Sequence, residues 1–277
     1  MTEASASAAR RFVGPDDAAP SSDGGVTTRY MRLQNALIAW SDAAAGAVIR
    51  QGEAHELIVV LPDAGAVLSA GAVDVEASAR SICILPAGPS SIALNTAGRV
   101  IRAFSPFPEA LAGLAPNAVD YATARPGVKP LGAPMVYGGA PGIRVYDIER
   151  SKALAGRRPP SFQTGAMNLM WIEREGPTDR TKLDPHSHDD FEEGALVVAG
   201  EYVEHLRTPW GPDASQWHKD EHVTCRPGTL IIVPPTVIHT TETRGPGPHL
   251  MLNIFAPARA DHIKSGMVLN AKDYTAA

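Results

Sequence analysis

Residues 186–200 read HSHDDFEEGALVVAG, and the fold and chemistry of the chain can be worked out from this stretch. His186 and His188 are two residues apart, so on a strand their side chains point to the same face. Glu193 follows across an Asp-Asp turn and leads into an apolar run that ends at Gly200. Two imidazoles and two pairs of acids make a poor core segment. The stretch is therefore either a solvated acidic turn or half of a metal site.

A third imidazole follows another apolar run. Residues 229–239 read TLIIVPPTVIH, so His239 comes shortly after a strand-length segment that ends in two prolines. Three neutral imidazoles and one carboxylate suit Fe, Mn, Ni, Cu, Co or Zn, and leave positions open for water, substrate or dioxygen. We expect one divalent metal ion per chain, with Fe(II) favoured and Mn, Ni, Cu or Zn as alternatives. The expected ligands are His186, His188, Glu193 and His239.

These two stretches resemble the two motifs of the cupin superfamily. The first motif has His-x-His, a glutamate and a glycine at the spacing found here, although Arg180 stands where the family has a leading glycine. The second motif is matched from Gly228 to His239, with Thr236 and Thr243 in place of a glycine and an asparagine. The resemblance implies the same four ligands. Since the family also allows a shorter spacing, Glu192 stays open as the alternative carboxylate, and the offset to Gly200 favours Glu193.

A weak internal repeat extends this resemblance to most of the chain. SICILPAGPSS (81–91) can be aligned with TLIIVPPTVIH, which puts Ser91 at the position of His239. The resemblance implies an all-β fold of two tandem β jelly-roll (double-stranded β-helix) barrels, a bicupin whose first barrel has lost its metal. The expected domains are a flexible leader (1–28), a degenerate N-terminal cupin barrel (29–105), a linker (106–140), a metal-binding C-terminal cupin barrel (141–262) and a tail (263–277).

Composition narrows the function. The 277 residues include 25 glycines and 24 prolines, and a net charge of −5 offers no basic face for nucleic acid. Short apolar runs between Gly and Pro breaks are typical of β structure. We find no signal peptide, no run long enough to span a bilayer and no disulfide framework, since Cys83 and Cys225 are far apart in the sequence. We expect a soluble cytoplasmic protein that binds neither nucleic acid nor membrane.

Other polar residues are candidates for catalysis. His205 and Arg207 are expected to share one face of a strand and to line the pocket, with Tyr202 facing the other way. Glu192, Tyr202 and His205 are the candidate acids or bases, and Arg207 would favour an anionic substrate. The insertion at 207–225 contains Trp210 and Trp217 and is either a lid, an oligomer contact or a solvated loop.

The expected function is that of a mononuclear metal enzyme acting on a small organic substrate, with an Fe(II)-dependent dioxygenase as first choice. The first alternative is a lyase, isomerase or hydrolase that uses the ion as a Lewis acid. The second alternative is a non-catalytic cupin that binds a small ligand. A homodimer is implied by the family resemblance only.

Overall fold

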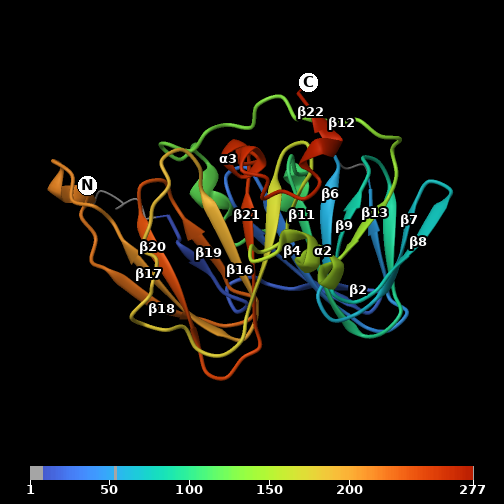
Figure 1. Ribbon diagram of the computed structural model, residues 1–277, viewed down its shortest axis with the longest axis horizontal. Coiled ribbons are helices and arrows are strands. Elements are labelled where there is room, and N and C mark those ends of the chain that lie inside the picture. The colour runs from blue at the N-terminus through green and yellow to red at the C-terminus, as the bar shows by residue number, and fades with distance from the viewer. Residues whose placement is uncertain (1–8, 53–54, 277) are drawn as a thin grey trace, which may run out of the picture.

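The chain folds into two β jelly-roll barrels that lie side by side, joined by loops and a few short helices (Figure 1). The computed structural model describes residues 9–52 and 55–276. The predicted all-β jelly-roll fold is confirmed. Each barrel is a pair of facing antiparallel sheets, as alternating strands separated by Gly and Pro turns require.

The first barrel consists of a seven-stranded sheet, in the order β13-β9-β6-β11-β4-β3-β2, and a four-stranded sheet, in the order β5-β10-β7-β8. Its interior is filled by aliphatic side chains, among them Leu57, Val59 and Leu68. Its strands are β2 (Ser21–Asp23), β3 (Val26–Arg32), β4 (Leu37–Ala43), β5 (Val48–Gln51), β6 (Leu57–Leu61), β7 (Ala66–Ala70), β8 (Val73–Ala77), β9 (Ser81–Leu85), β10 (Ser90–Leu94), β11 (Gly98–Phe104) and β13 (Arg144–Asp147).

The second barrel consists of a six-stranded sheet, in the order β1-β19-β16-β21-β15-β14, and a three-stranded sheet, in the order β18-β17-β20. Gly200 makes the tight turn between β16 and β17, with a positive φ and no room for a Cβ atom beside His249. The strands of this barrel are β1 (Phe12–Val13), β14 (Ser161–Gln163), β15 (Asn168–Arg174), β16 (Glu193–Ala199), β17 (Glu201–Arg207), β18 (Glu221–Cys225), β19 (Leu230–Val233), β20 (Ile238–Arg244) and β21 (His249–Phe255).

Each barrel contains a strand from beyond its predicted boundary. The strand Phe12–Val13 pairs with β19 of the second barrel, and β2 pairs with β3, so the prediction of a flexible leader is wrong for these parts of residues 1–28. Residues 1–8 of that leader lie outside the described residues. The strand Arg144–Asp147 pairs with β9 of the first barrel, although it was assigned to the second. Strands this short form because they pair with segments far away in the sequence, so their own residues give little indication of a strand.

The large sheets of the two barrels pack face to face. One continuous apolar cluster contains Ile58 and Ile82 from the first barrel together with Trp171, Leu196 and Leu252 from the second, all of them buried. Along β15, β16 and β21 the alternate residues face the interior of the second barrel. The packing of the two sheets therefore fixes which side chains the second barrel presents to its interior.

Short elements close the ends of the barrels. Helix α2 (Ile148–Ala155) is capped by Asp147, whose carboxylate accepts a hydrogen bond from the Arg150 backbone N–H. Helix α3 (Ala260–Lys264) lies beside the mouth of the second barrel. No helix among the described residues is long and apolar enough to cross a bilayer. The remaining elements are α1 (Glu109–Ala112), α2 (Ile148–Ala155), α3 (Ala260–Lys264), the 3-10 turns η1 (Ala118–Tyr121), η2 (Ala214–Gln216) and η3 (Ala271–Asp273), and the strands β12 (Val136–Tyr137) and β22 (Tyr274–Thr275).

Candidate metal centre

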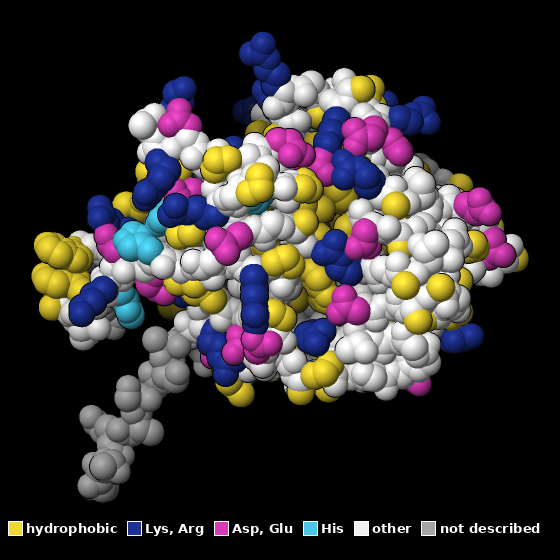
Figure 2. Space-filling model, turned by 90° about the horizontal axis from the view of Figure 1, so that it is seen from below, with side chains coloured by type: hydrophobic (Ala, Val, Ile, Leu, Met, Phe, Trp, Pro, Cys, Tyr) yellow, Lys and Arg dark blue, Asp and Glu magenta, His cyan; other side chains and the backbone are white. Residues whose placement is uncertain are grey.

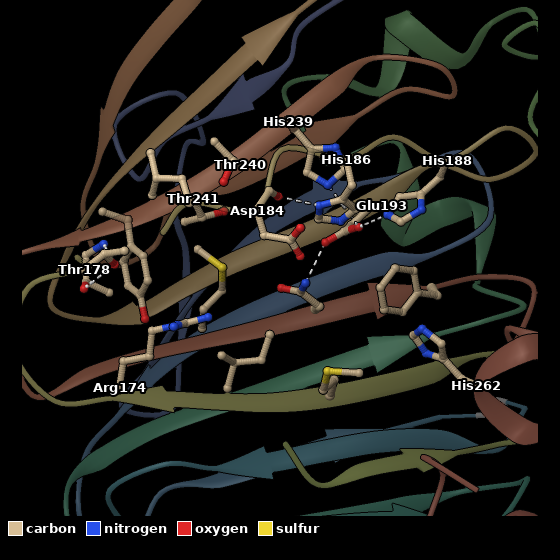
Figure 3. A pocket seen from close by; sticks show the side chains of 18 of the residues that line it. Arg174, Thr178, Asp184, His186, His188, Glu193, His239, Thr240, Thr241 and His262 are labelled. Atoms are coloured by element: carbon tan, nitrogen blue, oxygen red, sulfur yellow. Dashed lines mark hydrogen bonds and ion pairs between the residues drawn. The ribbon is translucent and has the colours of Figure 1, made fainter. Parts of the chain in front are cut away.

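The four predicted ligands meet inside the second barrel. One possible ligand atom from each of His186, His188, Glu193 and His239 lies within 4.8 Å of the corresponding atoms of the other three (Figure 3). Glu193 begins β16 and His239 lies on β20, in the facing sheet. Backbone hydrogen bonds of 3.0 and 2.8 Å between His186 and His239 hold the histidine segment against β20. Among the described residues, this is the one His/Cys/Asp/Glu group with such spacing.

A sharp turn brings His239 into place. Thr236 has a φ of 66°, and its backbone N–H donates to the His188 carbonyl at 2.5 Å. This φ favours glycine, which is the residue that the cupin motif has at this position. The threonine keeps the turn and tolerates the left-handed conformation because neighbouring backbone contacts fix it.

Hydrogen bonds on the outer side of the cluster orient the imidazoles. The Nδ1 atoms of His186 and His239 lie 2.9 and 3.2 Å from the carbonyl oxygens of Asp184 and Val237, to which they can donate. This tautomer leaves the Nε2 lone pairs free, and the buried Nε2 of His239 has no hydrogen-bond partner among the described residues. Outer hydrogen bonds of this kind are typical of metal-binding histidines. The donor set and the orphaned nitrogen fit a divalent transition-metal ion.

The carboxylate of the cluster comes from Glu193. Burial opposes its ionisation, but the 2.9 Å hydrogen bond with His188 and the His239 ring nitrogen 3.5 Å away outweigh burial and lower the pKa of Glu193 to about 2. Its second oxygen accepts a hydrogen bond of 2.6 Å from the Asn253 amide. Glu193 is therefore held as an ionised and oriented carboxylate, which is the form that a metal ligand needs.

Glu192 points away from the cluster, into the contact between the second barrel and the linker. Its carboxylate accepts hydrogen bonds from the Arg125 guanidinium at 2.6 Å, from the Tyr121 hydroxyl at 3.1 Å and from the Gln34 backbone at 2.8 Å. Only 2% of the Glu192 side chain is exposed. The prediction of Glu192 as a catalytic base is wrong, because all of these partners lie outside the cavity. The linker that supplies Arg125 also holds Asp190 through Lys129.

A cavity of about 440 Å³ opens from the cluster along the barrel interior. Helix α3 adds His262, which is buried and whose pKa is lowered by burial, so that its ring is neutral. Most of the other walls come from β15, β20 and β21. The side chains that line the cavity besides the four ligands are Met170, Ile172, Arg174, Thr178, Lys182, Leu183, Asp184, Tyr202, Thr240, Thr241, Thr243, Met251, Asn253, Phe255, Arg259, His262 and Met267.

Strand β17 faces the opposite way from its prediction. Tyr202 is buried and lines the cavity, and Glu204 is buried beside it, where its carboxylate accepts a 2.6 Å hydrogen bond from the Thr241 hydroxyl. Burial raises the pKa of Glu204 to about 8. The prediction that His205 and Arg207 line the pocket is wrong. Both residues alternate with the inward-facing residues of β17, so their side chains face outward.

On the outer face of this sheet, the side chains of His205 and Arg207 contact residues at the start of β18. His205 Nδ1 lies 2.7 Å from His222 Nδ1, and Arg207 pairs with Asp220 at 2.5 Å. Figure 2 shows histidine, basic and acidic side chains together at this end of the molecule. In the insertion, Trp210 and Trp217 stack with their ring centroids 4.9 Å apart, both exposed, and no residue of 207–225 is among those lining the cavity described above.

Several residues of the cavity were missed by the sequence analysis. Arg174 and Asn253 end or interrupt apolar strands, and alternation from Met170 and Met251 would have placed them inside. Glu204, which contacts the cavity wall through Thr241, was not considered, because the facing of β17 was reversed. His262 lies on the short helix α3 after β21, and no sequence pattern links it to the cluster.

Comparisons with solved structures support the fold. A variant of oxalate decarboxylase from Bacillus subtilis matches with a TM-score of 0.59 at 14% identity, over 91% of this chain and 78% of that chain. AerE from Microcystis aeruginosa matches with a TM-score of 0.56 at 10% identity, over 86% of this chain and 95% of that one. The chain matches no protein-family model and no curated protein. At these identities the likeness shows the fold alone, and it is consistent with the cupin resemblance of the sequence.

Proposed function

We propose that this protein is a mononuclear metal-dependent enzyme that acts on a small organic molecule in the second barrel. The observation that carries the proposal is the cluster of His186, His188, Glu193 and His239 at a cavity of about 440 Å³. Three imidazoles and one carboxylate leave coordination positions open on a divalent ion. The Bacillus subtilis oxalate decarboxylase that shares the fold contains Mn(II) centres.

Proton-transfer chemistry, as in a lyase, isomerase or hydrolase, is the reaction class that the cavity supports best. The bound ion would supply Lewis-acid polarisation of a substrate oxygen. The Glu204 carboxyl, whose pKa is raised to about 8 by burial, holds a proton at neutral pH. The Thr241 hydroxyl lies between this carboxyl and the cavity, because it hydrogen-bonds Glu204 and also lines the wall. Glu204 can thus deliver or accept a proton through Thr241.

An Fe(II)-dependent dioxygenase is the second candidate. It is favoured by the same donor set, since a site with three imidazoles, one carboxylate and open positions can hold substrate and dioxygen side by side. In that case Asn253 and Asp184 orient the ligands, and the apolar part of the wall, made by Met170, Ile172 and Met251, keeps water from the reacting atoms.

The test is the metal content of the full-length protein, purified without oxygen and without added metal. We expect close to one divalent ion per chain by mass spectrometry, and none in His186→Ala. The matched control is His218→Ala, an exposed histidine of the insertion, which should keep the ion. An unchanged metal content in His186→Ala would overturn the proposal.

Reconstitution separates the two reaction classes. Protein loaded with Fe(II) that consumes oxygen in the presence of aromatic or diketone substrates is a dioxygenase. Substrate turnover with Mn(II) or Zn(II) that is independent of oxygen and falls at least about tenfold in Glu204→Gln supports proton transfer. Tight ligand binding without turnover under either condition would identify a binding protein instead.

A further inference from the structure

The cavity has a second polar end, far from the metal ligands. Met170, Ile172 and Arg174 alternate along β15 and all line the cavity, and Arg174 is exposed, so its guanidinium lies at the open mouth, beyond the apolar residues of this strand. Figure 3 shows Arg174 across the cavity from His186, His188 and Glu193. Within residues 9–52 and 55–276, the structure gives the Arg174 guanidinium no acidic partner. The neighbouring Glu173 is already paired with Arg80 at 2.7 Å and with Lys152.

Tyr202 supplies a second donor at this end. Its side chain is 1% exposed and lines the cavity, yet its hydroxyl has no hydrogen-bond partner among the described residues. Burial raises the pKa of Tyr202, and the Arg174 charge opposes that rise only in part, so the phenol keeps its proton. A buried hydroxyl without a partner leaves a hydrogen bond unmade, which a bound ligand oxygen would supply.

We propose that Arg174 and Tyr202 bind a carboxylate of the substrate, at the opposite end from the group that meets the metal ligands. The statement that the other end of the substrate reacts rests on the proposed function. The anion site itself is inferred only from Arg174, Tyr202 and their surroundings. Lys182 also lines this end, but its charge is paired with Asp179 at 3.3 Å. One guanidinium and one phenol then offer one unpaired positive charge and a fork of donors, which suits a monoanionic carboxylate. A phosphate ester carries nearly twice that charge.

The register of β17 and β20 gives the distance between the two ends of this substrate. His239 lies opposite Leu206 on β17, four residues from Tyr202, so the two ends are roughly 13 Å apart along the strand. Between them one side of the wall is formed by Met170, Ile172 and Met251, and the β20 side is formed by Thr241 and Thr243. The substrate class is therefore an elongated organic acid whose middle has an apolar wall on one side and threonine hydroxyls on the other.

The experiment compares hexanoate with hexanamide, two probes of equal length that differ in charge. Binding to the full-length protein is measured by calorimetric titration, once with Zn²⁺ loaded and once after chelation. We expect hexanoate to bind on the order of tenfold more tightly in both states, the usual effect of a charged hydrogen bond. Arg174→Gln should abolish this preference without changing the metal content, and Tyr202→Phe should reduce it. The control is Arg207→Gln, on the outer face, which should leave it unchanged.

The other outcomes contradict the proposal in distinct ways. Equal or undetectable binding of the two probes overturns it, as does a preference that survives Arg174→Gln. A preference that disappears on chelation places the carboxylate on the metal ion instead. Tighter binding of hexyl phosphate than of hexanoate overturns the choice of carboxylate. If the protein binds no metal ion but still prefers hexanoate to hexanamide, the proposed enzyme function is wrong and the anion site is retained.

Discussion

At the residue scale, Glu192 and Glu193 are neighbours in the chain, yet their carboxylates point in opposite directions. Glu193 faces the histidine cluster, whereas Glu192 pairs with Arg125 of the linker. We predict that Glu193→Gln lowers metal affinity at least about tenfold, since a neutral amide replaces an ionised ligand. Glu192→Gln should keep the ion and lower the free energy of unfolding by about 3 kcal/mol, because it leaves the buried Arg125 charge without its partner. Metal titration and urea unfolding of both variants check this. Loss of metal in Glu192→Gln alone would reverse the assignment.

Glu204 gives the stability of the protein a specific dependence on pH. Its pKa is about 8 in the folded chain against an ordinary value of 4.5, so the folded state retains a proton that the unfolded state releases between these values. Stability from this group is present below pH 4.5 and is lost as the pH rises toward 8. We predict that Glu204→Gln removes up to about 4 kcal/mol of the decline between pH 5 and pH 8.

Urea unfolding of the wild-type protein and of Glu204→Gln at both pH values measures this difference. The matched control is Glu201→Gln, an exposed residue of the same strand, which should leave the pH profile unchanged. Parallel profiles for wild type and Glu204→Gln would mean that Glu204 ionises normally in the folded protein.

At the residue scale, the sequence predicted which four side chains meet, because the spacing of two short motifs fixes their places on facing strands. It did not predict the anion site or His262. Arg174 and Tyr202 belong to strands that carry no motif, and the register of the sheets brings them to the cavity, whereas His262 is brought there by the packing of helix α3.

At the scale of the elements, strand β17 shows that the alternation of side chains along a strand divides them into two faces but does not identify the buried face. The pattern EYVEHLR separates Tyr202, Glu204 and Leu206 from His205 and Arg207, but it does not say which set faces inward. The buried acid Glu204 made the two sets look equally polar. The neighbouring strands β18 and β20 settle the question through their register.

The short strand β1 should matter more for stability than its two residues suggest. Val13 is fully buried in the cluster between the barrels, whereas Val73 on β8 is 53% exposed. We predict that Val13→Ala lowers the free energy of unfolding by about 2 kcal/mol, from lost burial and the cavity left behind. The same change at Val73 should cost less than about 0.5 kcal/mol. Urea unfolding of the two variants gives the comparison, and equal effects would show that β1 does not pack as described.

At the scale of the whole molecule, the barrels share one core and exchange strands, so we expect them to unfold as one unit. Far-ultraviolet circular dichroism and tryptophan fluorescence should give coincident transitions in urea. A fragment of residues 141–277 should not fold by itself, because it lacks β1 and exposes Trp171, Leu196 and Leu252. Two separate transitions would contradict this prediction. The homodimer implied by the family resemblance stays a prediction, which light scattering can test.

The pairing of Phe12 with Ile231 also constrains how the protein is made in the cell. The first strand leaves the ribosome roughly 220 residues before its partner, which at about 5–20 residues per second is a delay of about 10–40 s. During that time the apolar side chains of Phe12 and Val13 have no sheet to join. The completion of the second barrel, and of the site inside it, must therefore wait until β19 and the strands after it have left the ribosome.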